Sequence, residues 1–323
     1  MASEFLEVNN LVVQYTSGGD IIHAVNGVDL KLNKGETLGL VGETGAGKTT
    51  ICKAILGILP DPPAKIMDGE ILLDDQDLLH TPEKDMLKIR GKKISMIFQD
   101  PMTALNPVMS VGAQISEAVL LHNGCTKAEA QQRTVDMLQM VGIPAERYVE
   151  YPHQFSGGMK QRVVIAMALA CDPELLLADE PTTALDVTIQ AQVLDMIKDL
   201  QKRFNTAMIL VTHDLGVVAE TCDNVAVVYA GHIVESGTKK DIFKDTRHPY
   251  TQGLFDSIPK LNDESRWLKP IEGLPPDPTN LPQGCVFSPR CPFAGDACRQ
   301  GPPPRVEVTP GHFVNCLRAE KEA

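Results

Sequence analysis

Short apolar runs alternate with amphipathic stretches along most of the chain. Four runs have the length and composition of buried strands: Thr37–Val41, Ile94–Phe98, Leu175–Ala178 and Ala207–Val211. Helical patterns lie between them, over Lys48–Leu59, Lys127–Val141, Gly158–Ala170 and Thr188–Lys202. Strands that alternate with helices predict an α/β fold, with a mostly parallel sheet covered by helices on both faces.

Two further segments show the period of two that is typical of antiparallel strands. Phe5–Tyr15 alternates apolar and polar residues, and Val225–Glu235 does so on either side of Gly231. We therefore expect an antiparallel sheet beside the parallel core. No internal repeat is visible, which indicates a single copy of this unit.

The composition changes sharply at Pro259. The segment from there to the end holds 12 of the 23 prolines and four of the eight cysteines. This change predicts a boundary between a domain over residues 1–258 and a small C-terminal domain over residues 259–323, rich in Cys and Pro and with little regular structure.

Charge and hydropathy exclude several classes of protein. The net charge of −12 argues against a nucleic-acid binder. The longest apolar run, Val163–Cys171, is far shorter than the roughly 20 residues of a membrane-spanning helix. Residues 1–5 have no features of a secretory signal, so we expect a cytosolic protein whose cysteines do not form disulfides.

A phosphate-binding loop follows the first predicted central strand. Gly42-Glu43-Thr44-Gly45-Ala46-Gly47-Lys48-Thr49 matches the pattern G-x-x-x-x-G-K-[ST] and precedes a predicted helix. Its glycines allow backbone N–H groups to face an anion at a helix N-terminus. We expect Lys48 to reach the β- and γ-phosphates and Thr49 to bind Mg²⁺. The strand and helix around the loop argue against a chance glycine-rich turn.

Two companion segments distinguish this chain from other nucleotide-binding proteins. The strand Leu175–Ala178 ends in two carboxylates: Asp179 would hold Mg²⁺ through water, and Glu180 would orient and polarise the attacking water. Ser156-Gly157-Gly158 opens a helix whose N-terminus could bind a second anion. Each segment alone has an ordinary reading, as a solvated acidic turn and as a capped helix.

Taken in order, these segments resemble the ATPase cassette of ABC transporters. The resemblance covers residues 5 to about 258 and implies a RecA-like core, an antiparallel β subdomain and a helical signature subdomain over about residues 100–160. It also implies roles for single residues. Tyr15 stacks on adenine, Thr50 completes the loop, Gln99 contacts Mg²⁺ and the attacking water, and His213 contacts the γ-phosphate.

The resemblance also implies partners. Two cassettes, either two copies of this chain or this chain and a paralogue, enclose each ATP between the loop of one and Ser156-Gly157-Gly158 of the other, with Asp186 at their junction. Gln99 lies where a transmembrane permease docks, and Asp100 to about Glu150 forms the surface that faces it. The protein is thereby expected on the cytoplasmic face of the membrane, coupled indirectly to an extracytoplasmic solute-binding protein and without nucleic acid.

Finer sequence features resemble one branch of the family, the importers of dipeptides, oligopeptides or nickel. They are Gln99–Pro107, His248–Thr251, Ile271–Pro275 and Cys285–Pro292 with Cys298 and Cys316. Peptide uptake is the leading interpretation, with nickel or another small solute as the competitor. A soluble ABC protein of DNA repair or translation is an alternative, but the chain has neither a long coiled-coil insertion nor a second cassette. A redox protein with a vestigial ATPase is another, but the intact catalytic residues argue against it.

Four cysteines are concentrated in the C-terminal segment. Between Cys285, Cys291, Cys298 and Cys316 lie 5, 6 and 17 residues. Zinc sites commonly pair their ligands as C-x₂₋₄-C, which is tighter than these spacings. Four thiolates suit a [4Fe–4S] cluster, and a proline-rich end with little core needs a covalent staple. We therefore expect a [4Fe–4S] cluster here, with zinc as the second hypothesis. The other four, Cys52, Cys125, Cys171 and Cys222, are interpreted as packing residues.

Overall fold

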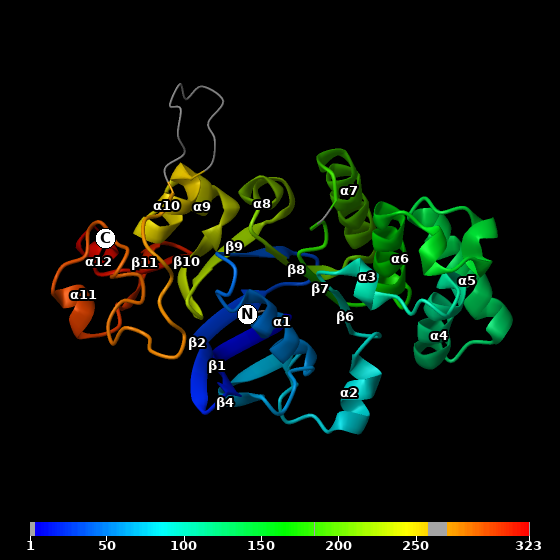
Figure 1. Cartoon of the computed structure of the whole chain (residues 1–323), viewed down its shortest axis with the longest axis horizontal. Helices are drawn as coiled ribbons and strands as arrows, with labels where there is room; N and C mark the ends of the chain where they lie inside the picture. The colour runs from blue at the N-terminus through cyan, green and yellow to red at the C-terminus, as the bar shows by residue number, and fades with distance from the viewer. Residues whose placement is uncertain (1–3, 184, 258–269, 323) are drawn as a thin grey trace. The chain divides into compact units, whose positions relative to one another are not determined.

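The computed structural model describes residues 4–183, 185–257 and 270–322. By its internal contacts the chain divides into two compact units (Figure 1). The first comprises Met1–Lys31, Leu38–Asp77 and Thr212–Ala323, and the second comprises Leu32–Thr37 and Leu78–Val211.

The first unit contains the predicted antiparallel sheet. Its strands are β1 (Leu6–Ser17), β2 (Asp20–Leu32), β4 (Ala64–Leu73) and β5 (Gln76–Asp77), in the order β2-β1-β4-β5. Strand β1 runs antiparallel to β4, and Val8 pairs with Ile71, both with no exposed surface. Alternate residues of β1 are buried, as a strand with one face on a core requires.

The first unit also carries the strand and helix that flank the phosphate loop. Strand β3 (Thr37–Val41) is buried along its whole length and pairs in parallel with β9 (Asn224–Tyr229). Helix α1 (Lys48–Leu56) was predicted to continue to Leu59. It ends earlier because Gly57 takes a left-handed φ of 66° and its N–H returns to the carbonyls of Lys53 and Ala54.

The C-terminal segment has more regular structure than predicted. Strand β10 (His232–Thr238) forms an antiparallel hairpin with β9, as expected around Gly231. A second hairpin, β11 (Arg305–Thr309) and β12 (His312–Asn315), pairs with β10 through β12. The prediction of a loop-rich appendage was therefore wrong for residues 305–315. These strands are too short to stand out in sequence, and they pair with a strand about 80 residues away.

Five helices complete the first unit. They are α8 (Leu215–Thr221), α9 (Lys239–Lys244), α10 (Pro249–Asp256), α11 (Ala297–Gln300) and α12 (Leu317–Glu322). The predicted domain boundary at residues 258 and 259 lies outside the described residues and stays a prediction.

The second unit combines parallel strands with a group of helices. Strands β8 (Ala207–Thr212), β7 (Leu175–Asp179) and β6 (Ile94–Ile97) are neighbours in that order and run parallel. The α-helices are α2 (Glu83–Ile89), α3 (Pro101–Ala104), α4 (Val111–Asn123), α5 (Lys127–Met140), α6 (Gly157–Leu169) and α7 (Val187–Phe204). Two short 3₁₀ turns, at Ala145–Val149 and Pro152–Gln154, lie between α5 and α6. The predicted α/β architecture is confirmed, and within the described residues no helix has the length and apolarity to cross a bilayer.

Candidate active site

The phosphate loop is shaped by close backbone approaches. Gly42 has a φ of 159°, and a Cβ there would lie 2.1 Å from the carbonyl oxygen of Val228. Gly47 has a φ of 103°, and its Cβ would lie 2.4 Å from the carbonyl oxygen of Ala24. Only glycine fits at these two positions. The loop therefore has one path between β3 and α1, fixed by the backbone on either side of it.

Lys48 lies across this loop at the start of α1. Its side chain is buried, and its ammonium donates hydrogen bonds to the carbonyls of Gly42 at 2.7 Å and Glu43 at 2.9 Å. The hydroxyl of Tyr15, on β1, lies 3.4 Å from that of Thr50. The structure thus brings Tyr15 to the first turn of the helix that follows the loop.

Glu43, in the second position of the loop, is held by residues that sequence reasoning missed. Its backbone N–H donates to the hydroxyl of Tyr250 at 3.0 Å. Its carboxylate pairs with the guanidinium of Arg290 at 2.8 and 3.1 Å. Burial, and the nearby charge of Glu43, raise the pKa of Tyr250, so its hydroxyl stays neutral. No local pattern could reveal these partners, because they lie 207 and 247 residues away in sequence.

His213 lies at the carboxyl end of a strand. It follows Thr212, the last residue of β8, and its side chain is exposed. The next residue, Asp214, caps α8 by accepting hydrogen bonds from the N–H groups of Gly216 and Val217. The cap fixes the backbone around His213 and leaves its imidazole on the surface.

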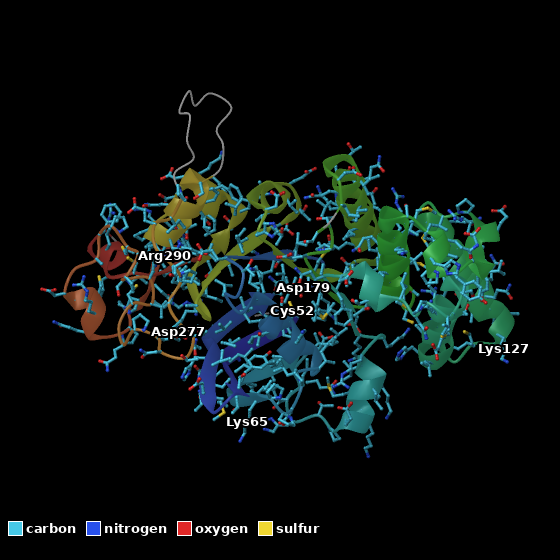
Figure 2. All side chains as sticks on the ribbon, viewed as in Figure 1. Cys52, Lys65, Lys127, Asp179, Asp277 and Arg290 are labelled. Carbon is cyan, nitrogen blue, oxygen red and sulfur yellow. The ribbon has the colours of Figure 1, made fainter. Side chains whose placement is uncertain are left out.

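In the second unit, the two carboxylates end strand β7. Asp179, labelled in Figure 2, is its last residue. Its side chain is buried, with only 3% exposed. Glu180 has a φ of 46°, a left-handed conformation that costs free energy for a residue with a side chain. Its N–H donates to the carbonyl of Val211 at 2.9 Å, which fixes this conformation. Strained backbone held by its surroundings is common at functional sites.

The structure brings Gln99 to Glu180. The Gln99 amide donates to the Glu180 carboxylate at 2.9 Å, although 81 residues separate them. The same carboxylate oxygen accepts a hydrogen bond at 2.9 Å from the hydroxyl of Thr183, a residue that the sequence did not single out. Two donors thereby orient the carboxylate that we expect to act on water.

The Ser-Gly-Gly segment opens α6 as predicted. The Ser156 hydroxyl accepts a hydrogen bond from the N–H of Met159, and Ser156 and Gly157 are exposed. A Cβ on Gly158 would lie 2.9 Å from the Ile189 side chain, so glycine lets the start of α6 approach α7. Further along α6, the amide of Gln161 donates to the carbonyl of Pro181, directly after Glu180.

Asp186 has a structural contact that the resemblance does not mention. Its carboxylate accepts a hydrogen bond from the N–H of Ile189 at 3.0 Å and caps α7. The residue is exposed. Its side chain therefore lies on the surface at the N-terminus of a long helix.

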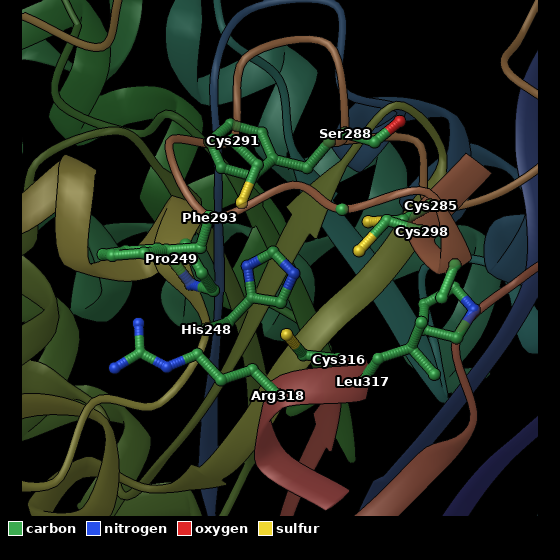
Figure 3. A pocket seen from close by; sticks show the side chains of 14 residues that line it. His248, Pro249, Cys285, Ser288, Cys291, Phe293, Cys298, Cys316, Leu317 and Arg318 are labelled. Atoms are coloured by element: carbon green, nitrogen blue, oxygen red, sulfur yellow. The ribbon is translucent and has the colours of Figure 1, made fainter. Parts of the chain in front are cut away.

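The four C-terminal cysteines line one cavity of about 230 Å³ in the first unit. Figure 3 shows their sulfur atoms directed toward a common space, beside His248 and Phe293. Burial raises the pKa of the Cys285 thiol to about 11, although a hydrogen bond from the N–H of Phe287 opposes the shift. Among the described residues, no three His, Cys, Asp or Glu side chains form a group able to hold a single metal ion.

Comparison with known proteins gives two family matches. The family described as "ABC transporter" matches residues 25–183, and the one described as "Oligopeptide/dipeptide transporter, C-terminal region" matches residues 234–298.

Similar proteins extend over the whole chain. It is 51% identical to the oligopeptide transport ATP-binding protein AppD of Bacillus subtilis, over 99% of this chain and 98% of that protein. It is also 51% identical to the dipeptide transport ATP-binding protein DppD of the same organism, over 98% and 96%. A solved ATP-binding cassette, a dimer in a post-hydrolysis state with ADP and Pi, is 27% identical, with a TM-score of 0.65 over 72% of this chain and 98% of that one.

Proposed function

Because this chain belongs to the ATP-binding proteins of the ABC transporter family, we propose that it hydrolyses ATP to drive the uptake of dipeptides or oligopeptides across the cytoplasmic membrane. The observation that carries this proposal is that similarity to peptide-transport proteins continues past the cassette. It includes the C-terminal region and covers nearly the full length of two relatives at 51% identity. Nickel or another small solute is the alternative cargo.

The nucleotide site is proposed to work as follows. Tyr15 stacks on adenine, while the loop from Gly42 to Thr50 surrounds the phosphates and Lys48 neutralises them. Thr49 and Gln99 would contact Mg²⁺, and Asp179 would hold it through water. Glu180 polarises the attacking water, and His213 contacts the γ-phosphate. The hydrogen bond between Gln99 and Glu180 supports a shared task for these two residues.

We further propose that two cassettes share each ATP. In this arrangement Ser156-Gly157-Gly158 of one chain closes the site of a second copy or a paralogue, and Asp186 lies at the junction. The exposure of Ser156, Gly157 and Asp186 supports the arrangement, because surface groups are available to a partner. The similar solved cassette is itself a dimer with ADP and Pi.

The permease is proposed to dock on the second unit, near Gln99 and Met102–Leu105. Two apolar side chains on either side of this segment lie on the surface: Phe98 is 41% exposed and Val108 is 79% exposed. Exposed apolar residues beside a short helix are suited to receive a helix of a membrane subunit. This contact would hold the chain on the cytoplasmic face of the membrane, with a solute-binding protein engaged on the opposite side.

A photo-crosslinker tests the docking proposal and the cargo together. Placed at Ala104 in intact membranes, it should capture an integral membrane permease, whereas the same crosslinker at exposed Met67 on β4, outside the segment expected to face the permease, should not. When the complex is reconstituted with its solute-binding protein, di- or oligopeptides should then raise its ATPase activity. Capture of soluble proteins alone would count against docking. Stimulation of the ATPase activity by nickel alone would show that nickel, and not a peptide, is the cargo.

We also propose that Cys285, Cys291, Cys298 and Cys316 hold a [4Fe–4S] cluster. Support comes from their shared cavity and from backbone N–H groups of Phe287 and Phe293 that bond to Cys285 and Cys291, as donors to cluster thiolates do. A zinc ion would need four sulfurs within about 2.3 Å of one point. Four irons spread the ligands further apart. Zinc stays the alternative.

Metal analysis of anaerobically purified protein tests this site. We expect a brown protein with broad absorption near 400 nm and about four irons per chain. The Cys298→Ser protein should lose the iron. Cys222 is a buried cysteine, and burial raises the pKa of its thiol to about 12. The Cys222→Ser protein is therefore the control and should keep the iron. One zinc and no iron would refute the cluster and keep the site. No metal in anaerobic protein would refute both.

A further inference from the structure

One arginine of the cysteine-rich end reaches the phosphate loop. Arg290, directly before Cys291, pairs with the carboxylate of Glu43 through two hydrogen bonds, between Nη1 and Oε2 at 2.8 Å and between Nη2 and Oε1 at 3.1 Å. The Arg290 side chain is 5% exposed and that of Glu43 is 28% exposed. A two-pronged, largely buried pair of this kind fixes both position and orientation. Arg290 is labelled in Figure 2.

The guanidinium is fully occupied by its surroundings. Besides Glu43, it donates to the carbonyls of Ile271 at 3.2 Å and Glu272 at 3.1 Å and to the hydroxyl of Tyr229 at 3.3 Å. These contacts use all five of its N–H donors. Arg290 therefore cannot swing away from Glu43 without also breaking its hydrogen bonds to Ile271, Glu272 and Tyr229, so the pair is a fixed part of the site.

A second set of contacts joins the segment Cys285–Cys291 to the phosphate loop. The ring of Phe287 packs on Tyr229 and Tyr250, with centroids 5.2 and 5.4 Å apart. The hydroxyl of Tyr250 accepts the backbone N–H of Glu43. Cys285–Cys291 thus contacts Glu43 on both its side chain and, through Tyr250, its backbone.

The chemistry of the loop explains why this pairing matters. Glu43 places a negative charge next to residues that hold a polyphosphate, and an unpaired carboxylate there would repel the ligand. The carbonyl of Glu43 also accepts a hydrogen bond from Lys48 at 2.9 Å, so the position of Glu43 bears on the position of the lysine.

We propose that Arg290 is a positioning residue for nucleotide binding, which neutralises Glu43 and holds the phosphate loop in its binding shape from the cysteine-rich end. It acts through Glu43 and does not itself touch the nucleotide. The proposal rests on the nucleotide site described above. It makes the cysteine-rich end a contributor to ATP affinity in addition to any metal that it binds.

A double-mutant cycle between Arg290 and Glu43 tests the proposal. In the full-length protein, Arg290→Met should raise the Kd for MgADP by about tenfold. It should raise the KM for ATP similarly and leave kcat nearly unchanged. Adding Glu43→Gln should return the Kd to within about threefold of the starting protein, because the unpaired carboxylate is gone. Arg290→Lys, which keeps the charge but not the two-pronged geometry, should give an intermediate Kd.

Matched controls separate this role from a purely structural one. Arg299→Ala removes an exposed arginine of the same segment, paired with Asp296, and should leave the Kd unchanged. If Arg290 only supported the fold, Glu43→Gln would not rescue Arg290→Met, and that result would overturn the proposal. So would an unchanged Kd in Arg290→Met. If Arg290→Met does not fold, the Kd of Arg290→Lys is compared with and without Glu43→Gln, and the same criterion of rescue applies. Absence of MgADP binding by the unmutated protein would instead refute the nucleotide site itself.

Discussion

Glu180→Gln is expected to lose ATP hydrolysis while keeping ATP binding. Glutamine has nearly the same shape but lacks the negative charge that polarises the attacking water, and loss of a positioned base lowers the rate by about 10²- to 10⁴-fold. Binding should persist because Lys48 and the loop glycines are unchanged. ATP-bound dimers should therefore accumulate, and size-exclusion chromatography with ATP would detect them.

The contacts of Glu180 make this substitution conservative. Gln99 and Thr183 donate to the same oxygen of its carboxylate, and the amide oxygen of glutamine, with two lone pairs, can accept both hydrogen bonds. Glu174→Gln, just before the same strand, is the matched control and should hydrolyse ATP at the normal rate. Normal turnover in Glu180→Gln would remove Glu180 from the catalytic role.

Much of the fold could be predicted because its signals are local. The five buried residues of β3, the glycines of the loop and the first turn of α1 follow one another directly, so a single stretch of sequence specifies strand, turn and helix. Helices α5 and α7 start and end within two residues of their predicted limits, because Thr126 and Asp186 cap them and the amphipathic period is regular.

What escaped prediction depends on contacts between distant segments. Hairpin β11–β12 consists of short strands whose partner is β10, and their pattern alone is too brief to indicate a sheet. Arg290 looks like one more surface charge in a proline-rich segment until folding places it on Glu43. The left-handed backbone of Glu180 is likewise invisible in sequence, since it is imposed by the Val211 carbonyl.

The shared cavity of the four cysteines is an intermediate case. Their number and spacing predicted a common site, and their side chains line one space. The spacing could not specify how far apart their sulfur atoms lie, because these distances depend on how the intervening prolines and glycines fold.

Lys48→Ala is expected to weaken nucleotide binding itself, in contrast to Glu180→Gln. The ammonium would bond to the β- and γ-phosphates, and hydrogen bonds that involve a charged group contribute about 1.5–3 kcal/mol each. Tyr15→Ala removes one aromatic stack, which contributes about 1–3 kcal/mol. Equilibrium titration with MgADP and MgATP should therefore show a larger loss of affinity for Lys48→Ala than for Tyr15→Ala. In Lys48→Ala the loss of affinity should be greater for MgATP than for MgADP.

The position of Lys48 also predicts how the loss arises. Lys48 donates hydrogen bonds to the carbonyls of Gly42 and Glu43. Its removal therefore takes away a positive charge and two hydrogen bonds that order the backbone of the loop. Lys65→Ala, an exposed lysine on β4, is the control and should bind nucleotide normally. Abolished binding in Tyr15→Ala, with near-normal binding in Lys48→Ala, would reverse the proposed orientation of the nucleotide, because the base rather than the phosphates would then carry the affinity.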